Sequence, residues 1–130
     1  MRGRKRILIV DNSDKALCTL RDLLGRAGYD TVGTWSGMEA LNLLKSKDFG
    51  VLLVDEYLAD LYVGDFLERV SRLPLQPWVV VMRGGPAQIA EAGDLVPVAS
   101  SFVDKRRTDQ LCTAIEAHFA GHQSCKVSRN

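Results

Sequence analysis

The sequence predicts an α/β domain in which an open parallel sheet carries helices on both faces. Its 130 residues are the length of one domain. Short apolar runs rich in Val and Ile show no polar–apolar alternation, which is typical of strands buried on both sides. These runs alternate strictly with amphipathic helical patterns, and five such strand–helix pairs favour a doubly wound sheet.

The five predicted strands are distributed along most of the chain. The first, third and fourth are continuous apolar runs, whereas the second is weaker and the fifth has only approximate bounds. Strands of this composition suit a sheet that lies between two helical layers. In order, the predicted strands span residues 6–10, 31–34, 51–54, 78–82 and 98–103.

Each predicted strand is followed by a helical pattern. Ser13 can cap the first helix, which Gly28 would end, and Ser36 with Glu39 fits a capping box for the second. Residues 1–120 are predicted to form one domain and residues 121–130, which are polar and unpatterned, a flexible C-terminal tail. The last three helices are indicated by Phe66, Leu67 and Val70, by Pro86 ahead of residues 87–92, and by Thr108 capping a helix that includes Phe119.

Composition and charge argue against several classes of protein. The chain is 46% hydrophobic and 25% charged, close to the average of soluble globular proteins. A net charge of +1 gives no support to nucleic-acid or membrane-surface binding. No apolar run approaches the ~20 residues that a membrane span needs. The 3 cysteines form no disulfide framework and indicate reduced thiols, so a cytoplasmic protein is expected.

Charged residues follow four of the predicted strands. They are Asp11, Asp55, Arg83 and Lys105, each at the end of a different strand. Because the carboxyl ends of parallel strands meet at one rim, where such sheets bind their ligands, these side chains are expected to converge. A single carboxylate at a strand end is commonly a helix cap, but four charged residues converging indicate a functional site.

Residues 6–119 resemble the receiver domain of bacterial two-component response regulators. The resemblance rests on an ordered set of segments: the opening strand with Asp11-Asn12, residues 36–41, residues 51–55 and residues 102–105. It implies a flavodoxin-like (βα)5 doubly wound parallel sheet with strand order 2-1-3-4-5. It also implies a role in phosphorelay signal transduction, without an independent catalytic function.

The same resemblance implies roles for individual residues. Asp55 would accept a phosphoryl group from a histidine kinase or phosphotransfer protein, and Lys105 would contact a phosphoryl oxygen. Mg²⁺ would be held by Asp11, Asp55 and the backbone carbonyl of Tyr57, because this ion prefers oxygen ligands. Asn12 stands where the family has a second metal-binding acid.

Three departures from the family pattern concern this site. Asn12 removes one negative charge, and Arg83 replaces a Ser or Thr and adds a positive one, so Mg²⁺ binding is expected to be weak or lost. Two unit charges about 4 Å apart interact by roughly 4 kcal/mol at an effective dielectric of 20. Arg83 can also form a bidentate pair with Asp55 or Asp11 in place of the metal. Arg106 replaces the proline after the lysine, which predicts a trans peptide bond.

Two functions remain open from the sequence. The chain is either an atypical phospho-receiver in which Arg83 assists the phosphoryl group, or a phosphorylation-independent pseudo-receiver that acts as an interaction or dimerisation module. Both would act through a downstream protein or a homodimer, using the surface around Phe102, the family's switch aromatic. Glu56 or Asp14 can restore some negative charge, although neither matches a family ligand. Nucleotide hydrolysis is disfavoured because the chain lacks a G-x-x-x-x-G-K-[ST] loop.

Overall fold

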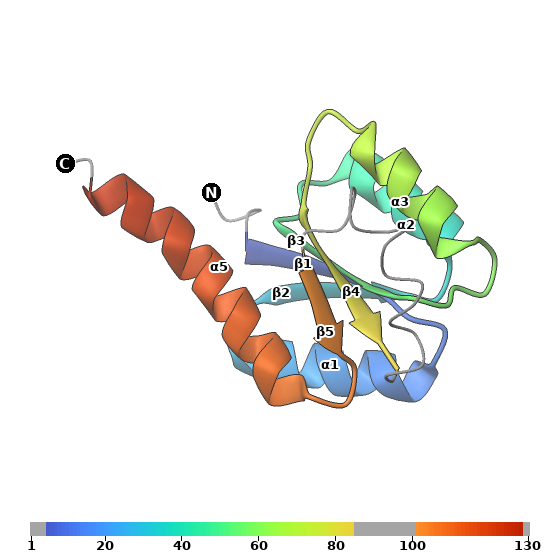
Figure 1. The fold of residues 1–130 in the computed structure, drawn as a ribbon, viewed down its shortest axis with the longest axis horizontal. Coiled ribbons are helices and arrows are strands. Elements are labelled where there is room, and N and C mark those ends of the chain that lie inside the picture. The colour runs from blue at the N-terminus through green and yellow to red at the C-terminus, as the bar shows by residue number, and fades with distance from the viewer. Residues whose placement is uncertain (1–4, 85–100, 129–130) are drawn as a thin grey trace.

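The computed structural model describes residues 5–84 and 101–128, and these residues form a parallel α/β fold (Figure 1). The sheet has five strands in the order β2-β1-β3-β4-β5. This confirms the predicted fold class and strand order. The strands are β1 (Arg6–Val10), β2 (Asp30–Thr34), β3 (Val51–Asp55), β4 (Trp78–Arg83) and β5 (Ser101–Asp104).

The helices cover both faces of the sheet. Figure 1 shows α2 and α3 together on one face, and α1 and α5 on the other. The helix predicted over residues 87–92 lies outside the described residues. No helix among the residues that the structure describes is long and apolar enough to cross a membrane. The described helices are α1 (Asp14–Arg26), α2 (Gly37–Ser46), α3 (Val63–Ser71) and α5 (Thr108–Ser128).

Two apolar layers form the core, one on each face of the sheet. Successive residues of a strand point to opposite faces, so Leu52 packs towards α2 and α3 while Leu53 packs towards α1 and α5. Phe66 anchors the first layer and Ile115 the second, and neither is exposed. The absence of polar–apolar alternation in the strand sequences therefore reflects burial on both sides, as predicted.

Helix α5 is longer than the sequence predicts. It continues to Ser128, so residues 121–128 of the predicted flexible tail are helical. The region contains no proline, and an isolated glycine such as Gly121 costs only about 1 kcal/mol relative to alanine within a helix. The helix can therefore continue beyond the last residue whose apolar pattern was recognisable, Phe119. The domain boundary at residue 120 stays a prediction.

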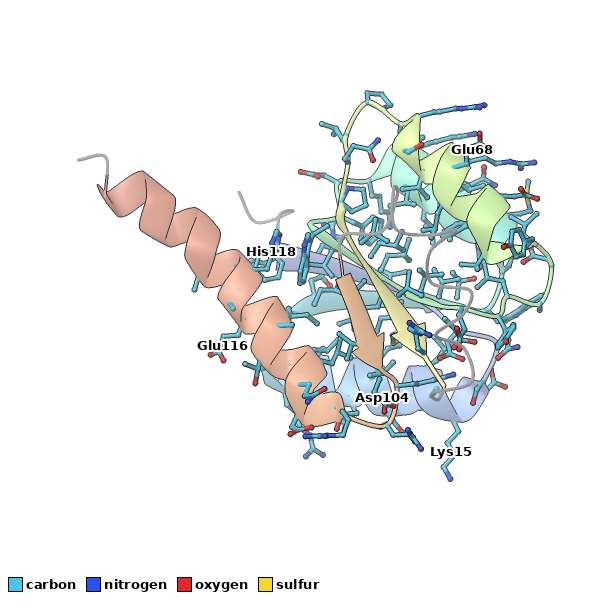
Figure 2. The ribbon with its side chains drawn as sticks, viewed as in Figure 1. Lys15, Glu68, Asp104, Glu116 and His118 are labelled. Carbon is cyan, nitrogen blue, oxygen red and sulfur yellow. The ribbon has the colours of Figure 1, made fainter. Side chains whose placement is uncertain are left out.

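Two aromatic stacks attach α5 to the rest of the domain. The rings of Trp78 and His118 lie 4.5 Å apart and nearly parallel, and those of Tyr29 and Phe119 lie 5.3 Å apart. Figure 2 shows His118 on the side of α5 that faces the sheet and Glu116 pointing away from it. The middle of α5 is thus held at the amino-terminal end of β4.

The helix caps differ from prediction in one detail. Ser13 caps α1 by accepting a hydrogen bond from the Ala16 N–H, as predicted. Ser36 Oγ accepts one from the Glu39 N–H, but the Glu39 carboxylate does not return to the Ser36 N–H. It accepts instead from Thr34 Oγ1, which itself accepts from the Ser36 N–H. A third polar side chain has therefore replaced half of the predicted capping box.

Candidate functional site

The sheet register brings the predicted site residues to one rim. Asp55, the last residue of β3, lies opposite Met82, and Arg83 lies opposite Asp104. Asp11 directly follows β1, where its N–H donates to the Thr34 carbonyl. The carboxyl ends of β1, β3, β4 and β5 therefore meet at this rim, as expected for a parallel sheet.

Lys105 bridges the two carboxylates at the rim. Its Nζ lies 2.9 Å from Asp11 Oδ2 and 3.1 Å from Asp55 Oδ1. Asp11 is fully buried and Asp55 is 5% exposed. The lysine is held in place through its own backbone, because its N–H donates to the Arg83 carbonyl at 2.7 Å. Lys105, rather than Arg83, is thus the cation that the structure places between the two carboxylates.

Burial and charge act in opposite directions on the ionisation of this cluster. Burial raises the pKa of Asp55, and the charge of Lys105 lowers it by less than burial raises it. Burial would also lower the pKa of Lys105, but its hydrogen bond to Asp11 and the charge of Asp55 outweigh that effect and raise it. The Lys105 ammonium therefore keeps its proton readily, whereas ionising the buried Asp55 carboxyl group costs free energy.

The carboxylate oxygens at this rim are the kind of ligand that magnesium prefers, but few acidic side chains supply them. Asp11 Oδ2 is buried, and the cation that it contacts among the described residues is the Lys105 ammonium, 2.9 Å away. The oxygens of Asp11 and Asp55 suit Mg²⁺. Among the described residues, however, no group of three His, Cys, Asp or Glu side chains is placed to hold a metal. Asn12 is exposed beside Asp11. Asp11 and Asp55 therefore offer oxygen ligands of the kind that Mg²⁺ prefers, at the position that Lys105 Nζ contacts.

Two other predicted site residues lie on a strand or shortly after one. Tyr57, whose carbonyl was assigned to the metal, follows β3 and its side chain is 51% exposed. Phe102 lies within β5, where its backbone pairs opposite Val81. The Phe102 side chain is outside the described part of the structure, so its role as a switch stays a prediction.

A loop of ordinary geometry presents Lys105. Asp104 Oδ1 accepts hydrogen bonds from the Arg106 N–H at 2.9 Å and from its Nε at 3.1 Å, while Oδ2 accepts from Nη2 at 2.9 Å. These bonds lower the pKa of Asp104 to about 2. The peptide bond before Arg106 is trans, as predicted. Figure 2 shows Asp104 at the end of β5. A charge-assisted turn thus takes the place of a rigid proline.

Glu56 is a buried carboxylate that sequence analysis did not place. It follows Asp55, is only 8% exposed, and its Oε2 accepts a hydrogen bond from the Gly84 N–H at 3.0 Å. Its own N–H donates to the Met82 carbonyl. The charge count based on Asp11 and Asp55 left out this third buried acid, which the sequence analysis named only as a residue that can restore negative charge. The only signal in the sequence was an acidic residue directly after a buried strand.

Asp60 is a residue that sequence analysis did not identify. Its carboxylate accepts hydrogen bonds from Ser36 Oγ at 3.0 Å, the Gly37 N–H at 2.8 Å and the Met38 N–H at 3.1 Å. It therefore caps α2 from the loop that follows β3. Partial burial would raise the pKa of Asp60, but these hydrogen bonds outweigh it and lower the pKa. The cap fixes the loop that carries the Tyr57 carbonyl.

Replacing Asp60 with alanine is expected to lower the free energy of unfolding by about 1 kcal/mol, because α2 loses an N-terminal cap. The pKa of Asp60 is lowered in the folded protein, so its contribution is present above the unfolded pKa and lost as pH falls through the folded one. The loss of unfolding free energy caused by Asp60→Ala should therefore be smaller at acidic pH. Urea unfolding at neutral and acidic pH measures it, with Asp22→Ala on α1 as an exposed control. A deficit that does not depend on pH would contradict a charged cap.

No protein-family model matches the sequence. Comparison with curated proteins finds the polar-differentiation response regulators DivK of several Brucella species. Those of Brucella ovis and Brucella melitensis are 30% identical to this chain over 96 residues, which cover 68% of the chain and 78% of each relative. The DivK protein of Brucella anthropi is 29% identical over the same length.

Solved structures resemble the fold at lower sequence identity. A response regulator receiver domain from Clostridium thermocellum superimposes with a TM-score of 0.78 at 20% identity, covering 92% of this chain and 98% of that one. A CheY-like receiver domain from Methylobacillus flagellatus gives a TM-score of 0.72 at 17% identity, covering 85% of this chain and 97% of that one. These structures support the fold, and the DivK proteins are similar in sequence.

Proposed function

The chain belongs to the receiver-domain family of two-component response regulators, and from this membership we propose that Asp55 is its phosphoacceptor. The observation that carries the proposal is the contact of Lys105 Nζ with Asp55 Oδ1 at 3.1 Å, at the rim where β3 ends. Asp55 is buried to 5% exposure, and its carboxylate is the group that adjoins both Asp11 and the ammonium.

The proposed reaction is a phosphoryl transfer to the Asp55 carboxylate. An Oδ atom attacks phosphorus, and the bond from phosphorus to the donor's nitrogen or oxygen breaks with its electron pair leaving on the donor. Both reactants are anionic, so positive charge must be in place before attack. Lys105 supplies one such charge by contacting a phosphoryl oxygen. Arg83 stands at the end of β4 and would assist in place of a hydroxyl.

Magnesium is the cofactor that the family implies, and receiver domains typically bind it in an acidic pocket. In this chain Asp11, Asp55 and the Tyr57 carbonyl would hold it, with Asn12 contributing an amide oxygen. When bound, the ion would neutralise charge on the phosphoryl group. Binding is proposed to be weak, because Asn12 carries no charge and Lys105 already occupies both carboxylates.

Receiver domains of this family generally act with kinases or phosphotransfer proteins and with downstream partners. For this chain we propose a histidine kinase or phosphotransfer protein as donor, and a downstream protein or a second copy of the chain as output. The proposal includes neither a membrane nor a nucleic acid as partner. It also includes no independent catalytic activity beyond accepting the phosphoryl group.

Intact-mass spectrometry after incubation with acetyl phosphate and Mg²⁺ tests the proposal. The wild-type protein and Asp22→Asn, an exposed control on α1, are expected to gain the mass of one phosphoryl group. Asp55→Asn is expected to gain none, since the attacking carboxylate is gone. A gain that persists in Asp55→Asn, or a folded wild type that gains nothing, would contradict Asp55 as the acceptor.

A second candidate is a pseudo-receiver that binds partners without phosphorylation. It is favoured by one observation: Lys105 pairs with both Asp11 and Asp55, so one of the two carboxylate charges is balanced without a metal. Under this candidate the wild type gains no phosphoryl mass. Partner binding would then be equal for the wild type and Asp55→Asn.

A further inference from the structure

Glu56 joins the ends of β3 and β4 through two hydrogen bonds. Its Oε2 accepts from the Gly84 N–H at 3.0 Å, and its backbone N–H donates to the Met82 carbonyl at 3.2 Å. The residue is only 8% exposed. Among the ion pairs that join described residues, none involves the Glu56 carboxylate. A buried carboxylate is thus held by backbone rather than by a cation.

The position of Gly84 links this carboxylate to the candidate phosphoacceptor. Met82 lies opposite Asp55 in the register, and Gly84 follows two residues later, so its N–H belongs to the same rim. Asp55 and Glu56 are adjacent in the chain, with Cα atoms about 3.8 Å apart. An anion formed on Asp55 therefore develops at the rim where the Gly84 N–H, already bound by the Glu56 carboxylate, also lies. Asp55 and Glu56 are both buried, and negative charges that share a buried rim repel more strongly than they do in bulk water.

Backbone N–H groups at the ends of strands are good donors to anions. At the end of β4 that donor is already engaged by Glu56. Among the described residues, a Cβ atom on Gly84 would meet Glu56 Oε2 at 3.9 Å, which agrees with this arrangement. The site therefore contains an anion of its own before any phosphoryl group arrives.

We propose that the Glu56 carboxylate is a built-in anion that opposes a phosphoryl-type anion at Asp55, by charge repulsion and by occupying the Gly84 N–H. The inference rests on the proposed function, because Asp55 is taken as the residue that carries the anion. It deepens that function by assigning a restraint to the site: phosphorylation must displace Glu56 from Gly84. Glu56 is accordingly a positioning residue, which acts on the site through β4.

Beryllofluoride, a stable mimic of a phosphoryl group on aspartate, provides the test. Its affinity in the presence of Mg²⁺ is measured by ¹⁹F and ¹⁵N NMR for the wild type, Glu56→Gln, Glu56→Asp and Glu68→Gln. Glu56→Gln removes the charge and is expected to bind about tenfold more tightly than the wild type. Glu56→Asp retains the charge and is expected to stay within about threefold of the wild type. Glu68→Gln removes an exposed charge on α3 and should change nothing.

The Gly84 amide gives a readout that a purely structural role would not change. In the wild type its ¹⁵N–¹H resonance is expected to shift when beryllofluoride binds, because the hydrogen-bond acceptor changes. Equal affinity of the wild type and Glu56→Gln, in folded proteins, overturns the inference and leaves Asp55 as acceptor. Binding by Glu56→Gln alone supports the inference and contradicts phosphorylation of the native protein. Absence of binding in every variant overturns both.

Discussion

Replacing Lys105 with methionine is expected to lower the free energy of unfolding by about 3 kcal/mol at neutral pH. Breaking a buried ion pair by removing one partner typically costs 3–5 kcal/mol, since the remaining charge is left buried. Here Asp11 and Asp55 both lose their cation while their side chains are 0% and 7% exposed. The Lys105 side chain is 27% exposed, which favours the lower end of that range.

The loss of unfolding free energy caused by Lys105→Met should depend on pH. Burial already raises the pKa of Asp55, and loss of the ammonium raises it further. An acid whose folded pKa is raised destabilises the protein above that pKa and ceases to do so below its unfolded pKa. The deficit is therefore expected to be largest near neutral pH and to shrink as pH is lowered.

Urea unfolding followed by circular dichroism at several pH values measures this effect. Lys105→Arg retains the charge and is expected to recover part of the stability. Lys45→Met, an exposed lysine on α2, is the matched control and should change stability by no more than about 0.5 kcal/mol. A Lys105→Met deficit that is equal at neutral and acidic pH would show that lost packing, not charge, causes it.

Combining Asn12→Asp with Arg83→Thr is expected to raise the affinity for Mg²⁺ by about a hundredfold. The pair of changes adds one negative charge and removes one positive charge at the rim. Each such charge is worth roughly 4 kcal/mol at about 4 Å before solvation offsets most of it. The added carboxylate also brings the acids at the metal position to three, which suits the oxygen coordination of Mg²⁺.

Isothermal titration with Mg²⁺ measures the gain, with each single substitution as a control of intermediate affinity. The double variant should also gain phosphoryl mass from acetyl phosphate faster than the wild type, and adding Asp55→Asn should abolish that gain. If the affinity of the double variant equals that of the wild type, the limit is the occupation of Asp11 by Lys105. The charge count at Asn12 and Arg83 would then not explain weak binding.

The fold could be predicted because its signals are local. Residues 51–54 are uniformly apolar because both faces of β3 are covered, and the sequence shows this directly. Strand order followed from family resemblance. The convergence of Asp11, Asp55 and Lys105 could also be predicted, because parallel strands place their carboxyl ends on one rim whatever the details of packing.

The missing features depend on long-range contacts that leave no local pattern. Asp60 binds residues 22 to 24 positions earlier in the chain, so its neighbours in sequence give no sign of a helix cap. Glu56 binds Gly84, 28 residues away. The conformation of a long side chain after a strand depends on which backbone donor lies nearby. The pattern of residues could suggest that Arg83 would reach Asp55, but only the packed structure shows Lys105 between the acids.

The aromatic stacks on α5 have a mechanical consequence. They hold the helix in place near Phe119. At a rise of 1.5 Å per residue, this point is roughly 16 Å from the start of the helix at Thr108 and roughly 13 Å from its end at Ser128. Figure 1 shows the far arm extending beyond the sheet. Leu111 and Ile115 are buried as well, so the part of the helix before Phe119 is packed against the sheet, and any movement of that part is carried along the rigid helix to its far end.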